Sequence, residues 1–245
     1  MPRISAAVAS LIVCCTLPVA ISATDPLRVC LVSGTEEYDS ATSLSAFKQH
    51  LEANYNAACT LIQAEGKDNL PGLEALEDCD VALFFTRRRT IDGEQLERVK
   101  KYCLGGNPIV AVRTASHGFQ NWLEFDKLVL GGSYDGHYKN NMPMKATIAP
   151  GAESHPILAG VEVLDSTSSL YRNYPLAEDA QMLVAGTTAE GTHPIAWTRV
   201  HNGGRVFYTS LGSPLDFQNE SFRRMAANAL FWTATRDVER LDAER

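Results

Sequence analysis

The stretch Pro108-Ile109-Val110-Ala111-Val112-Arg113-Thr114-Ala115-Ser116-His117-Gly118-Phe119 joins a short apolar run to small and polar residues. A continuous apolar run is typical of a parallel strand that is covered on both faces. In open α/β sheets, ligands bind outside the carboxyl ends of the strands. We therefore expect a cleft at the end of this strand. Four polar side chains are expected to face it: Arg113, Thr114, Ser116 and His117.

The chain before this strand alternates between strand and helix patterns. Apolar runs predict three strands: residues 27–34, 59–63 and 80–85. Ser40 is a candidate helix cap, because apolar residues follow it at three- and four-residue spacings up to Tyr55. Asp92 begins a second helix, which leads into the strand at 108–112. The order strand, helix, strand indicates right-handed parallel units.

The last third of the chain has a different pattern. Four strands are predicted there: residues 145–148, 181–187, 194–200 and 205–212. Asn202-Gly203-Gly204 separates the last two, and this turn sequence is a strong signal for a β-hairpin. A closing helix is expected over residues 221–233, followed by a charged tail at 236–245.

The composition is that of an ordinary globular protein. The 245 residues are 45% hydrophobic and 21% charged, which allows one large core, and we expect one domain at residues 24–235. The net charge of −7 and the pI near 5.4 argue against a nucleic-acid partner, because phosphate binding requires a clustered basic surface. A neutral or small polar ligand fits this composition better.

Residues 1–23 have the pattern of a secretory signal peptide. Arg3 precedes an apolar run that ends in small residues, so cleavage is expected after Ser22 or Ala23. Pro18 interrupts the run, which is near the minimum length of a membrane span and therefore fits a permanent anchor less well. The sequence thus predicts a secreted or periplasmic protein with no membrane association after cleavage.

Cleavage there leaves four cysteines: Cys30, Cys59, Cys79 and Cys103. An exported protein can form disulfides, and four cysteines allow three full pairings. Cys30 lies within an apolar strand and is predicted to be a buried thiol. Cys79 precedes a strand and Cys103 ends the next helix, so both are expected at one edge of the sheet, and we predict a Cys79–Cys103 disulfide. The spacings do not match a zinc site.

Two other segments are candidates for the cleft. Thr86-Arg87-Arg88-Arg89 follows a predicted strand directly, so Arg87 or Arg88 is expected to reach the cleft, although three consecutive arginines are also typical of a solvated loop. Residues 122–144 are irregular and contain the cluster Tyr134-Asp135-Gly136-His137-Tyr138. Long irregular segments in compact domains are often binding loops.

Segments spread over the chain form a recognisable set: Gly131-Gly132, Gly136-His137, His155-Pro156-Ile157-Leu158-Ala159-Gly160, Leu170-Tyr171, Gly204-Arg205-Val206-Phe207-Tyr208-Thr209-Ser210-Leu211-Gly212, Phe222-Arg223-Arg224 and Ala229-Leu230-Phe231-Trp232. Together they resemble the ThuA-like, or trehalose utilisation, family over nearly all of the chain after the signal peptide. The resemblance implies the fold of class I glutamine amidotransferases. That fold is α/β, with a mainly parallel twisted sheet in flavodoxin-like order, helices on both faces and an antiparallel C-terminal hairpin.

Two departures from related proteins bear on the chemistry. In amidotransferases of this class the central strand ends in an elbow that presents a cysteine nucleophile, and the corresponding position here resembles Thr114, with no cysteine nearby. Because that chemistry requires a thiolate, amidotransfer by this route is excluded. The family pattern Ser-Leu-Gly-His is replaced by Ser210-Leu211-Gly212-Ser213, so a histidine that would serve catalysis in relatives is missing.

His117 and His137 are the candidate catalytic residues, because an imidazole titrates near neutral pH and moves a proton in either direction. For His117 the alternative is a structural cap of the next helix. The candidate substrate-binding residues combine flat rings with planar or hydroxyl donors, which suit the faces and hydroxyls of sugars. They are Arg87, Arg113, Thr114, Ser116, Tyr138, Tyr171 and Arg172. For Tyr171 the alternative is a place in the core, and for Arg172 a place on the surface.

Two other chemistries fit less well. His117 and His137 need a third ligand to hold a metal ion, which Asp135 would supply, but we assign no metal and no cofactor. Ser116 lies in Thr114-Ala115-Ser116-His117-Gly118, which lacks the first glycine of the Gly-x-Ser-x-Gly elbow. Because Thr114 would crowd that strained turn, a serine hydrolase is disfavoured.

The sequence therefore predicts an exported enzyme that processes a small carbohydrate or keto-sugar by acid/base chemistry. The alternative is a non-catalytic carbohydrate-binding domain on the same scaffold, which the Ser213 departure favours. The trehalose link comes only from the family name and assigns no substrate. A homo-oligomer is compatible with the sequence, which identifies neither the sugar nor the bond that is altered.

Overall fold

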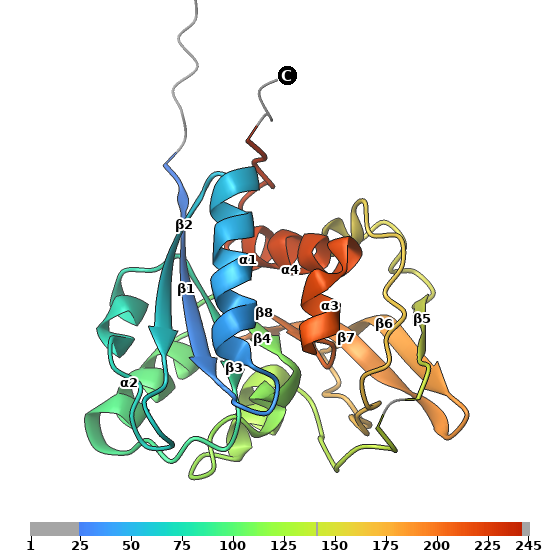
Figure 1. Ribbon diagram of the computed structural model, residues 1–245, viewed down its shortest axis with the longest axis horizontal. Helices are drawn as coiled ribbons and strands as arrows, with labels where there is room; N and C mark the ends of the chain where they lie inside the picture. The colour runs from blue at the N-terminus through green and yellow to red at the C-terminus, as the bar shows by residue number, and fades with distance from the viewer. Residues whose placement is uncertain (1–24, 141, 242–245) are drawn as a thin grey trace, which may run out of the picture.

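The structure is a computed structural model that describes residues 25–140 and 142–241, so the signal peptide predicted at 1–23 lies outside the described residues. Within them, one eight-stranded mixed sheet is flanked by helices (Figure 1). The strands are β1 (Leu27–Gly34), β2 (Ala57–Gln63), β3 (Val81–Thr86), β4 (Ile109–Val112), β5 (Lys145–Ile148), β6 (Gln181–Thr188), β7 (Gly191–His201) and β8 (Gly204–Thr209). The helices are α1 (Ser40–Asn54), α2 (Gly93–Leu104), α3 (Pro214–Gln218) and α4 (Glu220–Thr233), with 3-10 turns η1 (Leu73–Glu77), η2 (Arg113–His117) and η4 (Pro156–Leu158) and a π-helix η3 (Phe125–Leu130).

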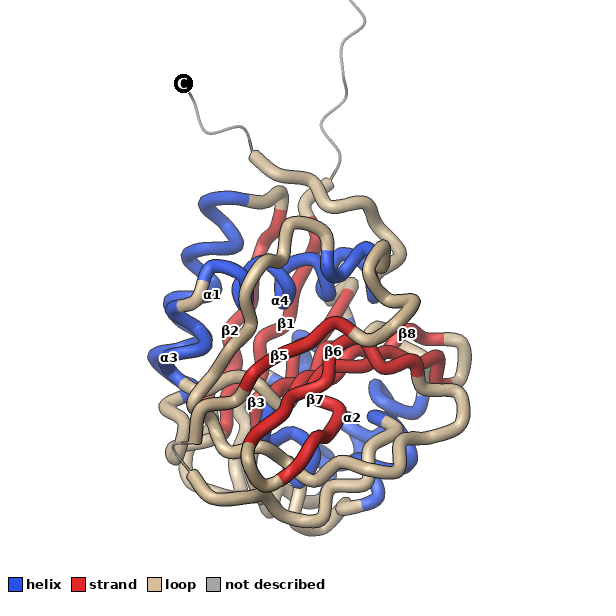
Figure 2. Tube along the Cα trace, turned by 90° about the vertical axis from the view of Figure 1, so that its right-hand side faces the viewer, coloured by secondary structure: helices blue, strands red, loops and turns tan. Residues whose placement is uncertain are grey.

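The strand order across the sheet is β2-β1-β3-β4-β8-β7-β6-β5. The first five strands in this order pair in parallel, which confirms the predicted α/β fold with flavodoxin-like order. The remaining strands pair antiparallel, and Figure 2 shows them crossing one side of the molecule. The predicted hairpin is β7–β8, closed where His201 faces Gly204.

β4 lies at the centre of the sheet, between β3 and β8. All its residues are buried, and they alternate between the two cores: Val110 and Val112 belong to one, Ile109 and Ala111 to the other. This alternation is the two-residue period of a strand with a helical layer on each face. The continuous apolar run in the sequence is therefore explained by burial on both sides.

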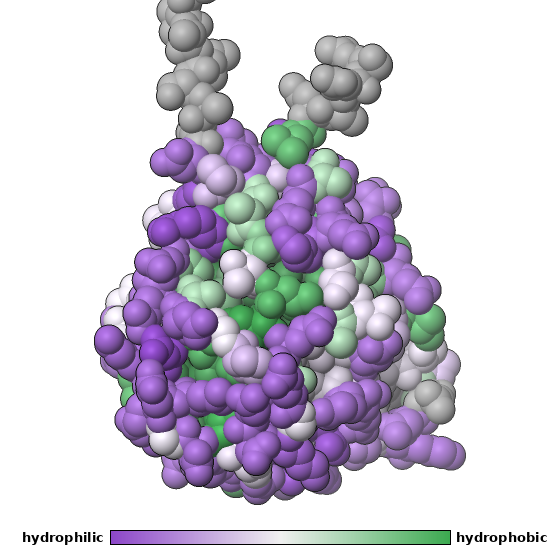
Figure 3. Space-filling view, turned by 60° about the vertical axis from the view of Figure 1, so that its left-hand side comes forward, coloured by the Kyte–Doolittle hydropathy of each residue, from purple (hydrophilic) through white to green (hydrophobic). Residues whose placement is uncertain are grey.

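The helices cover both faces of the sheet, as expected. Apolar side chains of α1 and α4 pack in one core, together with Phe217 of α3. Apolar side chains of α2, η1 and η3 pack in the other core. The face of the molecule that Figure 3 shows is mainly hydrophilic, with a hydrophobic patch at its centre. No helix within residues 25–140 and 142–241 is long and apolar enough to cross a membrane.

The described ends of the chain meet at the amino ends of the parallel strands. The amide of Leu27 donates to the carbonyl of Asn56 (2.9 Å), and the amide of Leu241 donates to the carbonyl of Asn54 (3.0 Å). The described part of the charged tail is thus tied to the junction of α1 and β2. In Figure 1 this end of the sheet lies opposite the carboxyl ends of β1 and β3.

The predicted Cys79–Cys103 disulfide is wrong, because all four cysteines of the described residues are free thiols. Cys103 is fully buried in the core under α2. The neighbouring residue on that helix, Tyr102, approaches Cys79 instead, with its hydroxyl 3.8 Å from the Cys79 sulfur. Successive residues of a helix point in directions about 100° apart, so sequence position near the sheet edge did not fix which side chain faces Cys79. Cys30 is buried, as predicted.

Candidate functional site

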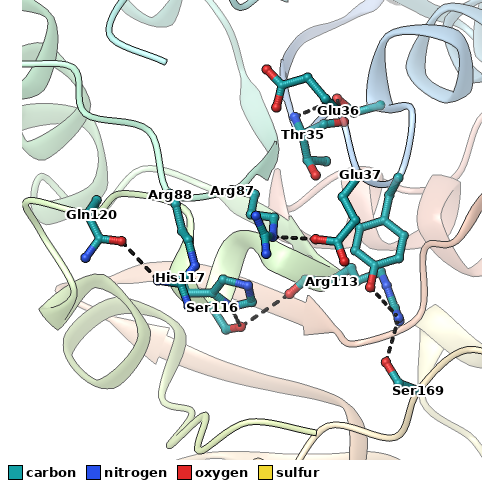
Figure 4. A network of polar contacts seen from close by, with 12 residues as sticks. Thr35, Glu36, Glu37, Arg87, Arg88, Arg113, Ser116, His117, Gln120 and Ser169 are labelled. Atoms are coloured by element: carbon teal, nitrogen blue, oxygen red, sulfur yellow. Dashed lines mark hydrogen bonds and ion pairs between the residues drawn. The ribbon is translucent and has the colours of Figure 1, made fainter. Parts of the chain in front are cut away.

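Polar side chains gather at the carboxyl ends of β1, β3 and β4 (Figure 4). The chain passes from β1 outward to β2 and returns to β3 on the other side of β1, so the direction of winding reverses here. Such a reversal separates the loops that leave the two central strands and makes room for a ligand. Glu37 follows β1, Arg87 and Arg88 follow β3, and η2 follows β4.

Arg113 is the first residue after β4 and has a left-handed backbone with φ 49°. Its side chain is 1% exposed, and its guanidinium donates to the Ser210 carbonyl at 2.8 Å and to the Ser169 hydroxyl at 3.1 Å. The same group lies over the rings of Tyr38 (4.2 Å to the centroid) and Tyr171 (4.9 Å). Arg113 is thus a fixed buried cation held by neutral groups.

The strained turn after β4 falls one residue earlier than the comparison with amidotransferases predicted. Arg113 carries the positive φ, whereas Thr114 is only 1% exposed, and its hydroxyl has no partner among the described residues. Thr114 is therefore enclosed and does not line an open cleft. The cause is η2, which turns the chain back into the protein directly after the strand.

His117 is nearly buried, with 8% of its surface exposed. Its ring stacks on Tyr134, with centroids 4.5 Å apart and planes 16° apart. Burial, and then the positive charges of Arg88, Arg87 and Arg113, lower the pKa of this imidazole to about 3. His117 is therefore neutral at physiological pH.

The hydrogen bonds of the two candidate histidines leave one nitrogen of each ring free for a ligand. The Nδ1 atom of His117 lies 3.1 Å from the Ser116 hydroxyl, which is nearer than the 3.4 Å from that hydroxyl to the Arg113 carbonyl. If Ser116 donates to the closer acceptor, Nε2 of His117 carries the proton. His137 Nδ1 lies 2.7 Å from the Tyr138 carbonyl, which only accepts, so Nδ1 carries a proton and Nε2 is the acceptor of the neutral ring.

The three arginines after β3 separate into different environments. Arg87 pairs with Glu37 at 2.6 Å, and Arg88 donates to the Gln120 side chain at 3.2 Å. Arg89 is 2% exposed and pairs with Glu36 at 2.7 Å. Arg87 and Arg88 thus flank His117, while Arg89 is part of the interior and not of a solvated loop.

His137 and Arg172 reach the same region from the irregular loops. His137 is exposed, forms an isolated β-bridge with Tyr171, and its ring lies 6.2 Å from the Tyr171 ring. Arg172 is exposed, and its guanidinium lies 6.0 Å from the Tyr138 ring. The Tyr138 hydroxyl points to His193 on β7, 3.3 Å from its Nε2. Tyr171 is buried between the two candidate histidines, so it serves both the core and the site.

No cluster of three or more metal-binding side chains occurs among the described residues. Asp135, the third ligand considered from the sequence, is exposed, and its carboxylate lies 3.9 Å from the Arg172 guanidinium. The charged group that Asp135 faces is therefore a guanidinium.

Sequence reasoning missed several residues of the site. Tyr38 and Ser169 contact the Arg113 guanidinium, and Tyr134 covers His117. Tyr38 follows β1 at its carboxyl end, which is a signal that the sequence contained. Tyr134 belongs to the aromatic cluster that singled out His137.

Asp126 was also missed, and it fixes the loop that carries Tyr134. It lies in the π-helix η3, a rare element that occurs frequently at functional sites. One carboxylate oxygen accepts the amide of Tyr134 at 2.8 Å, while the other has no partner among the described residues. Burial raises the pKa of this carboxyl to about 6.

We expect Asp126→Asn to stabilise the fold at pH 7.5. The folded-state pKa is raised from 3.8 to about 6, so the folded chain binds a proton that the unfolded chain has lost. The free energy of unfolding therefore falls as the pH rises from 3.8 through about 6. At about 1.36 kcal/mol per pKa unit, the loss is roughly 3 kcal/mol. The amide keeps the acceptor for Tyr134 and cannot ionise.

Urea unfolding at pH 7.5 and pH 4 measures this effect. The free energy of unfolding of the variant is expected to exceed that of the parent protein at pH 7.5 and to match it near pH 4. Asp135→Asn, an exposed change nearby, is the control and should show no such difference. A variant less stable than the parent at pH 7.5 would show that the Asp126 charge stabilises the loop.

Comparison with known proteins identifies relatives of this fold. A ThuA-like protein from Parabacteroides merdae has a TM-score of 0.65 at 17% identity, over 86% of this chain and 90% of that one. A ThuA-like protein from Bacteroides uniformis has the same TM-score and identity, over 88% and 94%. A cytoplasmic protein from Salmonella typhimurium has a TM-score of 0.59 at 14% identity, over 84% and 99%. No curated protein matches the sequence significantly.

The structural likenesses are below 25% identity and show the fold alone. The sequence itself matches the family model described as ThuA, trehalose utilisation, over residues 28–233. That match runs from β1 to the last residue of α4 and includes every strand of the sheet. The chain therefore belongs to the ThuA, or trehalose utilisation, family.

Proposed function

We propose that this chain processes a small carbohydrate or keto-sugar by acid/base chemistry at the carboxyl ends of β3 and β4. The observation that carries the proposal is the position of two imidazoles beside one tyrosine ring. The His117 and His137 rings lie 6.1 Å and 6.2 Å from the Tyr171 ring, measured between centroids. Export is part of the proposal and rests on the sequence pattern of residues 1–23.

The two imidazoles are suited to different roles. In a keto-sugar, Nε2 of His137 takes a proton from the carbon next to the ketone, and the electron pair of that C–H bond moves onto the carbonyl oxygen. Nε2–H of His117 donates a hydrogen bond to this oxygen as its negative charge develops. A neutral imidazole can polarise a carbonyl in this way, which agrees with the low pKa of His117.

The neighbouring groups supply binding surfaces for such a ligand. The half-buried ring of Tyr134 lies 4.7 Å from the buried ring of Tyr171 and offers apolar surface to the C–H side of a sugar. The guanidiniums of Arg87 and Arg88 offer planar donors to hydroxyl and carbonyl oxygens. Together with His117 and His137, these groups come from four separate segments, so the site exists only in the folded chain.

Proton exchange tests the enzyme proposal directly. The protein is incubated in D₂O with a panel of keto-disaccharides, and deuterium entry next to the ketone is followed by NMR. We expect saturable exchange, lowered by about a hundredfold or more in His137→Ala. His50→Ala, on α1 and away from the site, is the matched control and should keep the parent rate.

The second candidate is a non-catalytic carbohydrate-binding domain. It is favoured by Ser213, which stands where the family pattern has histidine and which caps α3 together with Asp216. That position is therefore structural in this chain and supplies no imidazole. Saturable binding of the panel without exchange or product would reject the enzyme and leave the binding domain.

A further inference from the structure

Positive charge gathers around His117 without matching negative charge. The charges of Arg88, Arg87 and Arg113 all act on this imidazole. Arg87 has a carboxylate partner, Glu37, at 2.6 Å. Among residues 25–140 and 142–241, neither Arg88 nor Arg113 forms an ion pair with a carboxylate. The site thus holds two guanidiniums without a directly paired carboxylate, in a chain with net charge −7, and the Asp216 charge acts on Arg113 without forming an ion pair.

Arg113 is the buried member of this group. It is 1% exposed, and its Nε has no hydrogen-bond partner within the described part of the chain. Its other nitrogens contact a carbonyl and two hydroxyls, all of them neutral. A buried cation loses its hydration, and neutral acceptors replace only part of it. The rings of Tyr38 and Tyr171, over which the guanidinium lies, also stabilise its positive charge.

The nearby carboxylates leave Arg88 without a partner. Glu36 pairs with Arg89, which is 2% exposed. Asp216 accepts from two serine hydroxyls and two backbone amides, and its charge acts on Arg113. Arg88 is therefore the guanidinium of this group with no carboxylate among the described residues to pair with, and an anionic ligand would supply one.

We propose that the ligand of this site is an anionic carbohydrate, one that carries a carboxylate or a phosphate held by Arg88. The inference rests on the proposed function, since it takes from it that a carbohydrate binds beside His117. Arg88 is exposed, and its single side-chain hydrogen bond among the described residues is to the neutral Gln120 side chain. A guanidinium in that position can form two parallel hydrogen bonds to a carboxylate or phosphate.

Anion binding has a consequence for the imidazole next to it. The arginine charges are among the causes that lower the pKa of His117, so a bound anion counteracts them and moves that pKa upward. His117 keeps its role as the hydrogen-bond donor of the proposed function, and its pKa is then higher with the charged ligand bound than in the free protein. A neutral sugar at the same place would leave the imidazole as it is in the free protein.

Calorimetric titration with four probes tests the proposal: glucose, glucuronate, glucose 6-phosphate and inorganic phosphate, all at one fixed ionic strength because salt screens these charges. We expect glucuronate or glucose 6-phosphate to bind at least about tenfold more tightly than glucose. The tighter of the two identifies the charged group as a carboxylate or a phosphate. Arg88→Gln should lower the affinity for that charged sugar to near the affinity for glucose, because the variant keeps a hydrogen-bond donor and loses the charge.

Arg98→Gln is the matched control, since Arg98 lies on α2 and pairs with Glu77 and Glu94 away from the site. Equal affinity for glucose and both charged sugars, or an unchanged preference in Arg88→Gln, would overturn the inference while the carbohydrate site stands. Inorganic phosphate binding as tightly as glucose 6-phosphate would support the anion site and contradict sugar recognition. Failure of all four probes to bind would overturn the anionic-ligand inference, while deuterium exchange with the keto-disaccharides would still decide the proposed function.

Discussion

Acidification from pH 6.5 to pH 3 is expected to remove roughly 5 kcal/mol of unfolding free energy through His117 alone. The pKa of its imidazole is lowered from 6.5 to about 3 in the folded chain, because the ring is buried and three arginines lie around it. In this window the unfolded chain binds a proton that the folded chain does not. The stabilisation is therefore complete above pH 6.5 and is lost as the pH falls. Each pKa unit corresponds to about 1.36 kcal/mol.

Urea unfolding of the parent protein and His117→Asn at pH 7, 5 and 4 isolates this contribution. The variant has no titrating group at this position, so its stability is expected to fall much less on acidification. His50→Asn is the control, because that ring is only partly buried on α1 and the steep acid loss should remain. An acid loss in His117→Asn as large as in the parent would show that this imidazole is not held neutral.

Gly204→Ala is expected to destabilise the fold by about 3 kcal/mol or more. A Cβ atom at this position would lie 2.3 Å from the Gly106 carbonyl oxygen and 2.9 Å from the Asn107 carbonyl oxygen. Both are backbone atoms of the loop that leads into β4, so neither can rotate away. Overpacking of this kind usually costs 1–3 kcal/mol, and more when backbone must move.

The adjacent change Gly203→Ala separates this steric effect from backbone strain. Gly203 has φ 89°, but a Cβ there meets nothing within 4 Å. Its expected cost is the roughly 1–2 kcal/mol of a left-handed residue with a side chain. Thermal unfolding of both variants gives the comparison, and Gly203→Ala being equally or more damaging would contradict the close approach of the hairpin to the β4 loop.

The fold could be predicted because its signals are local. Every predicted strand is present, and the bounds of β1 and β5 are those expected from the apolar runs. The short helix α3 was missed, although Ser213 and Pro214 are a cap and a first-turn proline. At five residues it is too short to show a helical period. The π-helix η3 has no sequence signature that distinguishes it from a turn.

The candidate site was predicted only in part, because tertiary contacts decide which side chains face it. His117 and Arg113 lie at the carboxyl end of β4, as the apolar run indicated. Thr114 is enclosed and Arg89 is buried, since the turn after β4 and the partner Glu36 are contributed by the fold and not by local sequence. The predicted Cys79–Cys103 disulfide is wrong for the same reason, because the fold decides which side chain of α2 faces Cys79.

The central claim is that His117 contacts a small ligand at the carboxyl ends of β3 and β4. Imidazole NMR spectra of histidine-labelled protein, recorded while glucuronate, glucose 6-phosphate or a keto-disaccharide is added, test it most directly. The account predicts a saturable shift of the His117 ring signals with at least one of these ligands, while His155, which caps η4, stays unchanged. Unchanged His117 signals in a folded protein that saturates with ligand would contradict it.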